Sequence, residues 1–343
     1  MKIDILCNDG SPLGITSKTI WGDNHRIGVG GAELALLTMC EEWYKVGYDV
    51  VLYNNPWEQN ASLFEQRNIN QFDVNGKRDV LITFRSPNPK AVAAKGYKVW
   101  WSCDPYTVSD FRHFSTFMDK IVCISKFHAE YFKNIYGINS TIVIDVPVRV
   151  NDYEGMNFEK VKNRIIFSSV PDRGLQYLNK YWDTIKNKIP DVSLVITSDY
   201  RLWGAGALNE KHRLSWLSKE NIEFLGAVNR QRLLEEELKA DLFVYPCVYD
   251  EFFCISCAEA QFAGAYPITS GRGALQTTNM GRVLLANPED VRNAGLWINS
   301  VVEILSDRNA LQSLQKQVQK KAINRFHPDK ILLRWDKEVF NGN

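Results

Sequence analysis

Two glutamates in the second half of the chain, Glu251 and Glu259, are spaced so that both could contact one ligand. They follow the apolar run Leu242–Tyr245, which is typical of a β-strand, and Glu259 falls in the helical pattern Ala258–Ala263. With Glu251 in the loop and Glu259 in the helix, both carboxylates would point toward the same end of a cleft. They could accept hydrogen bonds from the hydroxyls of a sugar and a ribose. The spacing also fits one acid at a helix N-terminus and one exposed acid.

A glycine-rich segment, Gly28-Val29-Gly30-Gly31-Ala32-Glu33, opens the helix that we expect over Ala32–Val46. Small residues there let a ligand approach backbone N–H groups, and the helix dipole favours an anion. A flexible loop with an N-cap explains the segment equally well. About twenty residues separate it from the first strand, Ile3–Cys7. This distance counts against a nicotinamide or flavin dehydrogenase, whose glycines directly follow that strand.

A third segment, Pro171-Asp172-Arg173-Gly174, lies between an expected strand and an expected helix. A cation at a strand-to-helix turn suits phosphate recognition by charge-assisted hydrogen bonds. Taken alone, Arg173 is more typical of a solvated surface residue.

The cysteines do not indicate a metal site. The chain has seven cysteines, an odd number, and only Cys254 and Cys257 form a C-x-x-C pattern. A zinc site needs a second ligand pair, and the five histidines form none. We therefore expect reduced thiols, no metal and no cofactor, in a cytoplasmic protein.

Short apolar strands alternate with amphipathic helical patterns along nearly the whole chain. The expected strands are Ile3–Cys7, Asp49–Tyr53, Val80–Phe84, Lys98–Trp101, Lys120–Ile124, Thr141–Ile144, Arg164–Ser168, Ser193–Thr197, Ile222–Leu225, Leu242–Tyr245, Tyr266–Ile268 and Arg282–Leu284. Continuous apolar strands separated by helices predict parallel sheets covered on both faces, which is the α/β class. Two sets of six strands favour two Rossmann-like, doubly wound domains over a single barrel.

The expected joint between the domains is Val146–Glu159, where proline, glycine, asparagine and aspartate interrupt the pattern. We therefore assign residues 1–150 to an N-terminal domain and 151–320 to a C-terminal domain. Residues 321–343 are expected to pack back toward the N-terminal domain, within a helical pattern over Ala310–Phe340 that breaks at Pro328. Ligands of such sheets bind at the carboxyl ends of the strands.

Charge and hydropathy exclude several classes of protein. The chain of 343 residues carries 41 Lys and Arg against 40 Asp and Glu, and residues 1–150 carry 16 of each sign. This balance argues against nucleic acid as a partner and gives no support for membrane docking through a basic face. No apolar run approaches the ~20 residues that span a bilayer. The N-terminus reads as a strand and not as a signal peptide.

The run from Arg164 to Gly273 resembles the donor half of retaining glycosyltransferases of family 4, which have the GT-B fold. The matching segments, in the family's order, are Arg173-Gly174, Leu225-Gly226-Ala227-Val228, Ala240–Pro246, the pair Glu251 and Glu259, and Ala263–Ile268. Gly30-Gly31-Ala32-Glu33 and Ile121–Tyr136 match the same family. The resemblance spans roughly residues 1–285.

This resemblance implies a division of roles in binding a nucleotide diphosphate sugar, linked to UDP or GDP. Glu259 falls on the ribose hydroxyls, and Glu251 falls on the transferred sugar together with the amides of Phe252, Phe253 and Cys254. Arg173 and the Gly30-Gly31 loop fall on the diphosphate. Val228 and the residues just before it line the nucleobase pocket.

The chain departs from the family pattern at four places. Ser168 stands where a second basic residue usually contacts the diphosphate, and Cys254 replaces a glycine. Cys103 replaces the histidine before Asp104. The loop Gly271–Gln276 lacks its acid and gains Arg272, which could supply the missing charge.

The resemblance implies sugar transfer to a hydroxyl acceptor, which we expect to be a glycan, with retention of configuration. Arg173, Arg272 and the Gly30-Gly31 amides would stabilise the departing diphosphate without a metal. Glu251, Arg173 and Asp104 are the expected catalytic residues. A non-catalytic sugar-nucleotide or glycan-binding protein and a sugar-nucleotide epimerase are the alternatives.

The expected acceptor residues follow the strand Lys98–Trp101. They are Trp101, Cys103, Asp104 and Tyr106. Trp101 and Tyr106 flank the Asp104 turn and are candidates for stacking on an acceptor sugar, whereas Trp100 is expected to pack in the core.

Overall fold

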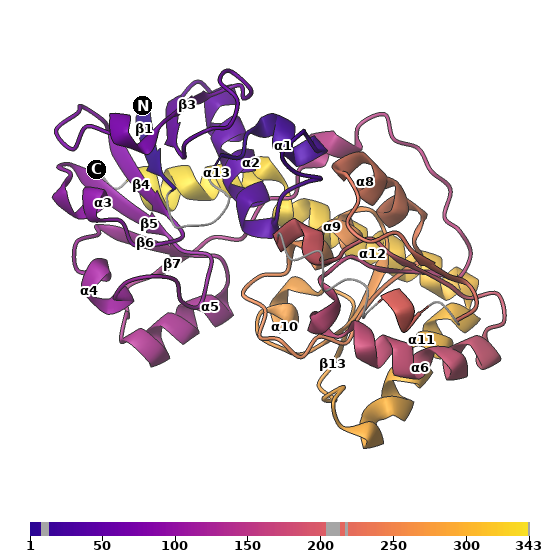
Figure 1. Cartoon of the computed structure of the whole chain (residues 1–343). Helices are drawn as coiled ribbons and strands as arrows, with labels where there is room; N and C mark the ends of the chain where they lie inside the picture. The colour runs from indigo at the N-terminus through magenta and orange to yellow at the C-terminus, as the bar shows by residue number, and fades with distance from the viewer. Residues whose placement is uncertain (8–13, 204–212, 217–218, 342–343) are drawn as a thin grey trace. The chain divides into compact units, whose positions relative to one another are not determined.

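The computed structural model describes residues 1–7, 14–203, 213–216 and 219–341, which form two compact units (Figure 1). Unit 1 comprises Met1–Ile20, Val29–Pro147 and Phe326–Asn343. Unit 2 comprises Trp21–Gly28 and Val148–Arg325. The short segment Trp21–Gly28 therefore packs with unit 2, although the chain on both sides of it belongs to unit 1.

Unit 1 is built on a seven-stranded sheet with the order β3-β2-β1-β4-β5-β6-β7. All neighbouring strands are parallel; Ile3, for example, lies opposite Val50 and Val80. The strands are β1 (Lys2–Leu6), β2 (Asp49–Tyr53), β3 (Glu65–Arg67), β4 (Val80–Phe84), β5 (Tyr97–Trp101), β6 (Lys120–Cys123) and β7 (Ile142–Val143). The helices are α1 (Ser17–Trp21), α2 (Gly31–Lys45), α3 (Pro89–Ala93), α4 (Phe111–Ser115), α5 (Lys126–Tyr131) and α13 (Pro328–Arg334). The strand order reverses between β1 and β4, which is the switch point of a doubly wound sheet.

The C-terminal residues complete the core of unit 1. Trp43 on α2 packs edge-on against Trp335, with ring centroids 5.1 Å apart, and Trp335 lies 5.3 Å from Trp101 on β5. The Tyr97 hydroxyl donates a hydrogen bond to the carbonyl of Val339. Figure 1 shows the yellow α13 beside the α2 ribbon. The buried indoles of Trp43, Trp101 and Trp335 therefore bring segments that are far apart in the sequence into one core.

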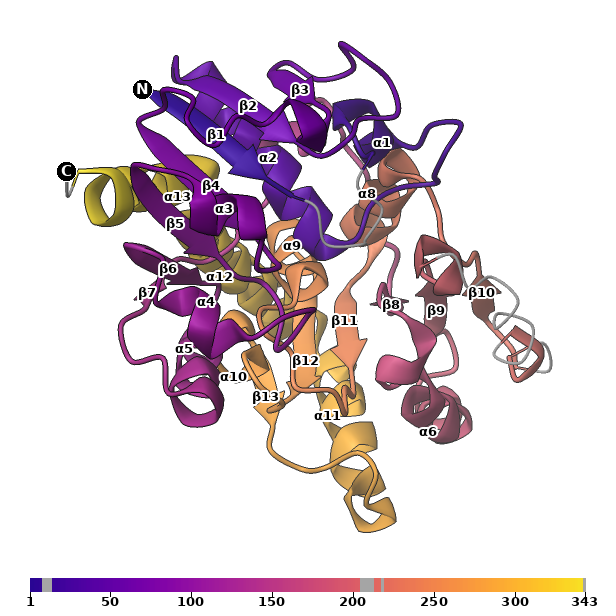
Figure 2. The same cartoon turned by 60° about the vertical axis from the view of Figure 1, so that its left-hand side comes forward.

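Unit 2 is built on a six-stranded parallel sheet with the order β10-β9-β8-β11-β12-β13 (Figure 2). The strands are β8 (Arg164–Phe167), β9 (Ser193–Ile196), β10 (Ile222–Phe224), β11 (Leu242–Tyr245), β12 (Tyr266–Ser270) and β13 (Arg282–Leu284). The helices are α6 (Leu175–Lys188), α8 (Arg230–Lys239), α9 (Ile255–Phe262), α10 (Leu275–Thr278), α11 (Ala294–Ser306) and α12 (Arg308–Phe326). Here the strand order reverses between β8 and β11.

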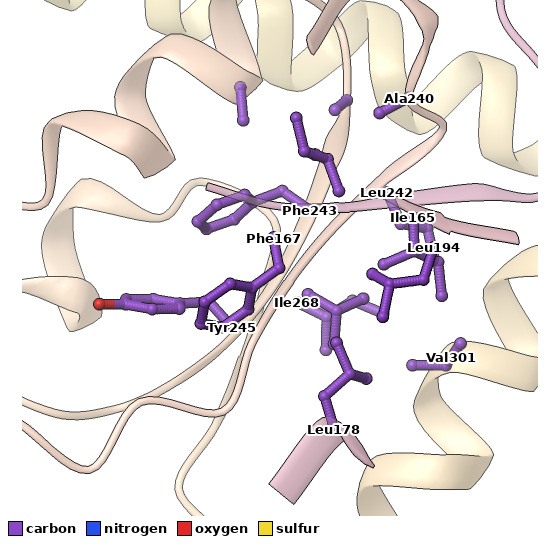
Figure 3. Close-up of a cluster of buried hydrophobic side chains, with 14 of the residues drawn as sticks. Ile165, Phe167, Leu178, Leu194, Ala240, Leu242, Phe243, Tyr245, Ile268 and Val301 are labelled. Atoms are coloured by element: carbon purple, nitrogen blue, oxygen red, sulfur yellow. The ribbon is translucent and has the colours of Figure 1, made fainter. Parts of the chain in front are cut away.

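The core of unit 2 follows from its continuous apolar strands. All four residues of β11 are buried, as are three of the four in β8 and in β9. Figure 3 shows Ile165, Leu194, Leu242 and Ile268 from neighbouring strands gathered near Leu178 of α6 and Val301 of α11. A strand buried on both faces needs apolar residues at its buried positions, and Ile165–Phe167, Leu194–Ile196 and Leu242–Tyr245 supply them.

The expected α/β class with two doubly wound parallel sheets is confirmed. All twelve expected strands are present, with ends within two residues of those expected. β3 was not expected, because Glu-Gln-Arg carries no apolar signal. The C-terminal helical pattern breaks at Pro328, which begins α13 after α12 ends at Phe326.

Candidate functional site

Arg173 and Glu251 meet at the switch point of the unit 2 sheet. Arg173 lies in the short helix η4 (Pro171–Arg173) after β8, and Glu251 follows the neighbouring strand β11. Nη1 of Arg173 donates a 2.8 Å hydrogen bond to Oε1 of Glu251. The phenol of Tyr245, at the end of β11, donates a 2.6 Å bond to the same oxygen. Arg173, which was predicted to bind the diphosphate, and Glu251, which was predicted to bind the sugar, therefore form an ion pair with each other.

The environment of Arg173 keeps its guanidinium charged. Burial, the largest single effect, lowers its pKa, but the carboxylate of Glu251 and the other ionisable groups around it together outweigh burial and raise the pKa above its ordinary value. The guanidinium carbon also lies 4.4 Å from the ring centroid of Tyr249, a cation–π contact. The backbone here is tight, because a Cβ on Gly174 would lie 2.2 Å from the carbonyl oxygen of Pro246. Glycine at position 174 thus lets the start of α6 approach the end of β11.

The residues after Glu251 lead directly into α9. Phe252, Phe253 and Cys254 are buried, and Cys254 is the residue that precedes the helix. Cys254 has φ of 73° and ψ of 78°, in the left-handed region. The cysteine therefore adopts the backbone conformation that favours the glycine usual in the resembling family.

Arg272 lies in the loop after β12, beside the backbone of Glu251. The amide of Ala274 donates a 2.7 Å bond to the carbonyl of Glu251. The Arg272 guanidinium is 3.9 Å from Asp250 and 3.8 Å from Glu289, both longer than a hydrogen bond. Its side chain is 39% exposed. Arg272 is thus a solvent-accessible cation next to the Glu251 loop.

Glu259 has different partners from Glu251. Its side chain in α9 is 4% exposed, and Oε1 lies 2.6 Å from Nη2 of the buried Arg230. Nε of Arg230 donates a 2.9 Å hydrogen bond to Asp152. Burial and the nearby Glu259 raise the pKa of the buried Glu237 to about 8. Glu259 therefore belongs to a buried charged cluster, which nothing in its spacing from Glu251 predicted.

The predicted nucleobase segment is held by an aspartate and an arginine that follow β9. Asp199 pairs with Nε of Arg201 at 2.8 Å, and Nη2 of Arg201 donates a 2.9 Å bond to the carbonyl of Ala227. The next residue, Val228, is partly buried. The Arg201 side chain remains 47% exposed, so the guanidinium stands at the rim of this segment.

Unit 1 has its own charged cluster at the carboxyl edge of its sheet. Arg85 follows β4, and its guanidinium pairs with Glu33 at 3.1 Å and with Asp104, which follows β5. Arg85 has a φ of 67°, a conformation that arginine rarely adopts and that tends to persist at functional sites. A Cβ on Gly30 would lie 2.6 Å from Oε2 of Glu33. This oxygen is the end of a flexible side chain that can shift, and the next residue, Gly31, begins α2.

The structure contradicts one predicted acceptor contact. Trp101 is 2% exposed and packs edge-on against Phe84, Trp43 and Trp335, so its ring cannot stack on a sugar. The prediction for Trp101 was wrong because aromatic residues at strand ends fill the core as readily as they line a site. Tyr106, by contrast, is 73% exposed. Cys103 is buried, and burial raises the pKa of its thiol.

The remaining site predictions concern metals, thiols and membranes. All seven cysteines are buried, and none forms a disulfide with another cysteine of the chain. Within the described ranges, no group of three or more His, Cys, Asp and Glu side chains is arranged to hold a metal ion. No helix in the same ranges has the length and apolar character to cross a membrane.

Comparison with protein families finds a match within unit 2. The family model described as glycosyl transferases group 1 matches residues 162–307, from just before β8 to just after α11. The match covers 146 of the chain's 343 residues, and we call residues 162–307 the group 1 domain after the family that they resemble. The group 1 domain contains Arg173, Val228, Glu251, Glu259 and Arg272.

Individual proteins are similar to more of the chain. An uncharacterized glycosyltransferase, YqgM of Bacillus subtilis (strain 168), is 22% identical over 209 residues, which cover 59% of this chain and 56% of that protein. The match thus spans little more than half of that relative. A glycosyltransferase structure from Rickettsia africae aligns over 100% of this chain and 99% of its own, with a TM-score of 0.73 and 14% identity. Anabaena Alr3699/HepE in complex with UDP and glucose aligns over 99% and 100%, with a TM-score of 0.71 and 15% identity. These structures show the GT-B fold.

Three residues of the sites described above escaped the sequence analysis: Arg85, Tyr245 and Arg230. Arg85 could have been found, because it directly follows the apolar strand β4. Tyr245 read as one apolar residue of a buried strand. Arg230 read as part of a polar helix start, although it is 5% exposed and pairs with two acids.

Proposed function

We propose that this protein transfers a sugar from a nucleotide diphosphate sugar, linked to UDP or GDP, to a hydroxyl acceptor with retention of configuration. The observation that carries the proposal is the Arg173–Glu251 ion pair at the switch point of the group 1 domain. One side chain provides fixed positive charge for a diphosphate, and the other provides an acceptor for sugar hydroxyls. The Anabaena structure with UDP and glucose supports a nucleotide sugar as the donor class.

The proposed step breaks the bond between the anomeric carbon and the diphosphate oxygen. The acceptor oxygen bonds to the same face of that carbon, and its proton passes to an oxygen of the departing diphosphate. Arg173 faces the growing negative charge, and Arg272 adds a second, solvent-accessible cation. Because two guanidinium groups supply this charge, the proposed step uses no metal ion.

The Glu33–Arg85–Asp104 cluster is our candidate for acceptor binding. Two carboxylates share one guanidinium there, which leaves a net negative charge. Excess carboxylate oxygens suit a ligand rich in hydroxyl donors, such as a glycan. Tyr106, exposed in the Asp104 loop, adds a ring face that could stack on a sugar.

Separating the products of nucleotide sugars tests the proposal. The protein is incubated with UDP- and GDP-linked sugars and a mixture of glycan acceptors, with and without EDTA. We expect free nucleoside diphosphate and a glycoside whose anomeric configuration, measured by NMR, equals that of the donor. An epimerised nucleotide sugar would instead support the epimerase alternative, and binding without any product would support a non-catalytic protein. Loss of activity in EDTA would contradict the metal-free step.

A further inference from the structure

The last residue of β11, Tyr245, has a role in packing and a polar group that packing does not use. Its side chain is fully buried, and its ring lies 5.7 Å from that of Phe167 and 5.5 Å from that of Phe243. Figure 3 shows the Tyr245 oxygen pointing away from the labelled aliphatic side chains of the core. The ring is fixed in the core, and its hydroxyl is therefore held at the edge of the sheet.

The hydroxyl of Tyr245 lies between two polar partners. It is 2.6 Å from Oε1 of Glu251 and 3.0 Å from Oγ of Ser169. A carboxylate paired with a guanidinium only accepts hydrogen bonds, so the single phenolic proton goes to Glu251. Ser169 must then donate to the phenolic oxygen. The hydrogen bonds run in one direction, from Ser169 to Tyr245 to Glu251.

The bonds fix one oxygen of Glu251 and leave the other for a ligand. Oε1 accepts from both Tyr245 and Arg173, at 2.6 and 2.8 Å. In the part of the chain that the structure describes, Oε2 makes no hydrogen bond with protein. One donor, Arg173, follows β8, and the other, Tyr245, ends β11. Together they hold the carboxylate of Glu251 in place. The second oxygen is then presented in a fixed direction.

We propose that Tyr245 is a positioning residue that holds Glu251 for a hydroxyl of the transferred sugar. This inference rests on the proposed function. It gives Tyr245, a buried residue of β11, a role in turnover that is separate from its role in core packing. Because Glu251 is proposed to contact the sugar, replacing Tyr245 should slow the reaction of nucleotide sugars. It should leave the binding of sugar-free nucleotides unchanged.

The test compares Tyr245→Phe with Tyr181→Phe. Both changes remove one buried phenolic oxygen from the core of unit 2; Tyr181 donates to the carbonyl of Pro288 at 3.1 Å, away from Glu251. We expect Tyr245→Phe to lower kcat about 10- to 100-fold, the effect of losing a hydrogen bond to a charged group. Its Kd for the free nucleoside diphosphate should stay within about twofold of wild type. Tyr181→Phe should leave both quantities unchanged.

A double variant separates positioning from general damage. If Tyr245 acts through Glu251, then Tyr245→Phe in a Glu251→Gln background should lower kcat no further than Glu251→Gln alone. Additive losses, or a Tyr245→Phe protein with wild-type kcat, would overturn the role of Tyr245. A wild-type protein that binds and turns over no nucleotide sugar would instead overturn the proposed function. The two failures are thus distinguishable.

Discussion

At the scale of single residues, the charge on Arg173 is the first property to test. Negative charge grows on the diphosphate as the glycosidic bond breaks, and a guanidinium can hold two of its oxygens at once. We expect Arg173→Ala to lower kcat by about 100-fold or more, and Arg173→Lys to restore part of the rate. Steady-state kinetics with saturating donor measure both.

The effect of replacing Arg272 on activity can be compared with the effect of replacing Arg173. Because Ser168 occupies the position of a second basic residue, Arg272 is the nearby candidate to share the charge. Arg173→Ala combined with Arg272→Ala should lose more activity than either single change. Near wild-type turnover in Arg173→Ala would show that the diphosphate is held by other groups.

Glu259 poses a different question, because it is already paired with the buried Arg230. Replacing it by alanine would remove one of the acids that pair with the buried Arg230 and would disturb the fold as well as any ligand. Glu259→Gln keeps the shape and a hydrogen-bond acceptor. We expect it to weaken binding of a nucleoside diphosphate by about 1.5–3 kcal/mol.

A deoxyribose ligand distinguishes ribose binding from structural damage. If Glu259 accepts ribose hydroxyls, a 2′,3′-dideoxynucleoside diphosphate should bind wild type and Glu259→Gln equally in calorimetric titrations. An equal loss for both nucleotides would show that Glu259 supports the fold only.

Site residues that come after an apolar strand could be predicted from the sequence. Site residues that are recognised only by an ion-pair partner far away in the sequence could not. Arg173 and Glu251 each follow an apolar strand, so their place at a sheet edge was predictable. Arg85 meets Glu33 across 52 residues, and Arg230 meets Asp152 across 78. Such pairings depend on which strands become neighbours, and a single sequence does not state strand order.

At the scale of elements, the start of α9 carries backbone strain at Cys254. A left-handed conformation costs a non-glycine residue about 1–2 kcal/mol, and a β-branched side chain tolerates it least. We expect Cys254→Gly to stay within about 1 kcal/mol of wild type, because relief of strain offsets the loss of a buried thiol. Cys254→Val should destabilise by about 2 kcal/mol or more.

Denaturant unfolding of both variants measures this difference. Equal stability of the valine and glycine variants would show that residue 254 leaves the left-handed region in solution. Donor affinity of Cys254→Gly should match wild type, because the amides at the start of α9 keep their arrangement.

Strands were easier to predict than short helices for a physical reason. A strand buried on both faces, such as β4 or β11, must be apolar at nearly every position, so its pattern survives in the sequence. Helices of five residues, such as α3 and α4, show less than two turns of periodicity. Asn88 and Asp110 cap them through side-chain hydrogen bonds, and those signals are shared with ordinary turns.

At the scale of the whole molecule, stability should fall on acidification because of His128. The side chain is fully buried in unit 1, and burial lowers its pKa to about 3. The unfolded chain binds a proton near pH 6.5, whereas the folded chain does not until about pH 3. Stability is therefore complete above pH 6.5 and is lost as the pH falls toward 3.

The loss of stability at low pH can be measured by comparing wild type with a variant whose residue 128 does not titrate. At pH 5 the contribution of His128 should be about 2 kcal/mol of unfolding free energy relative to pH 7.5. His128→Asn keeps an acceptor for the amide of Ile124 but does not titrate. Its unfolding free energy should depend less on pH between 7.5 and 5; an unchanged slope would assign the acid sensitivity to other groups.

The division of the chain into units has a consequence for protein synthesis. In unit 1, Trp335 packs against Trp43 and Trp101, but it is translated long after both of them. Residues 148–325 of unit 2 are all translated before that tryptophan. The core of unit 1 can therefore close around these three indoles only after residues 148–325 have been synthesised.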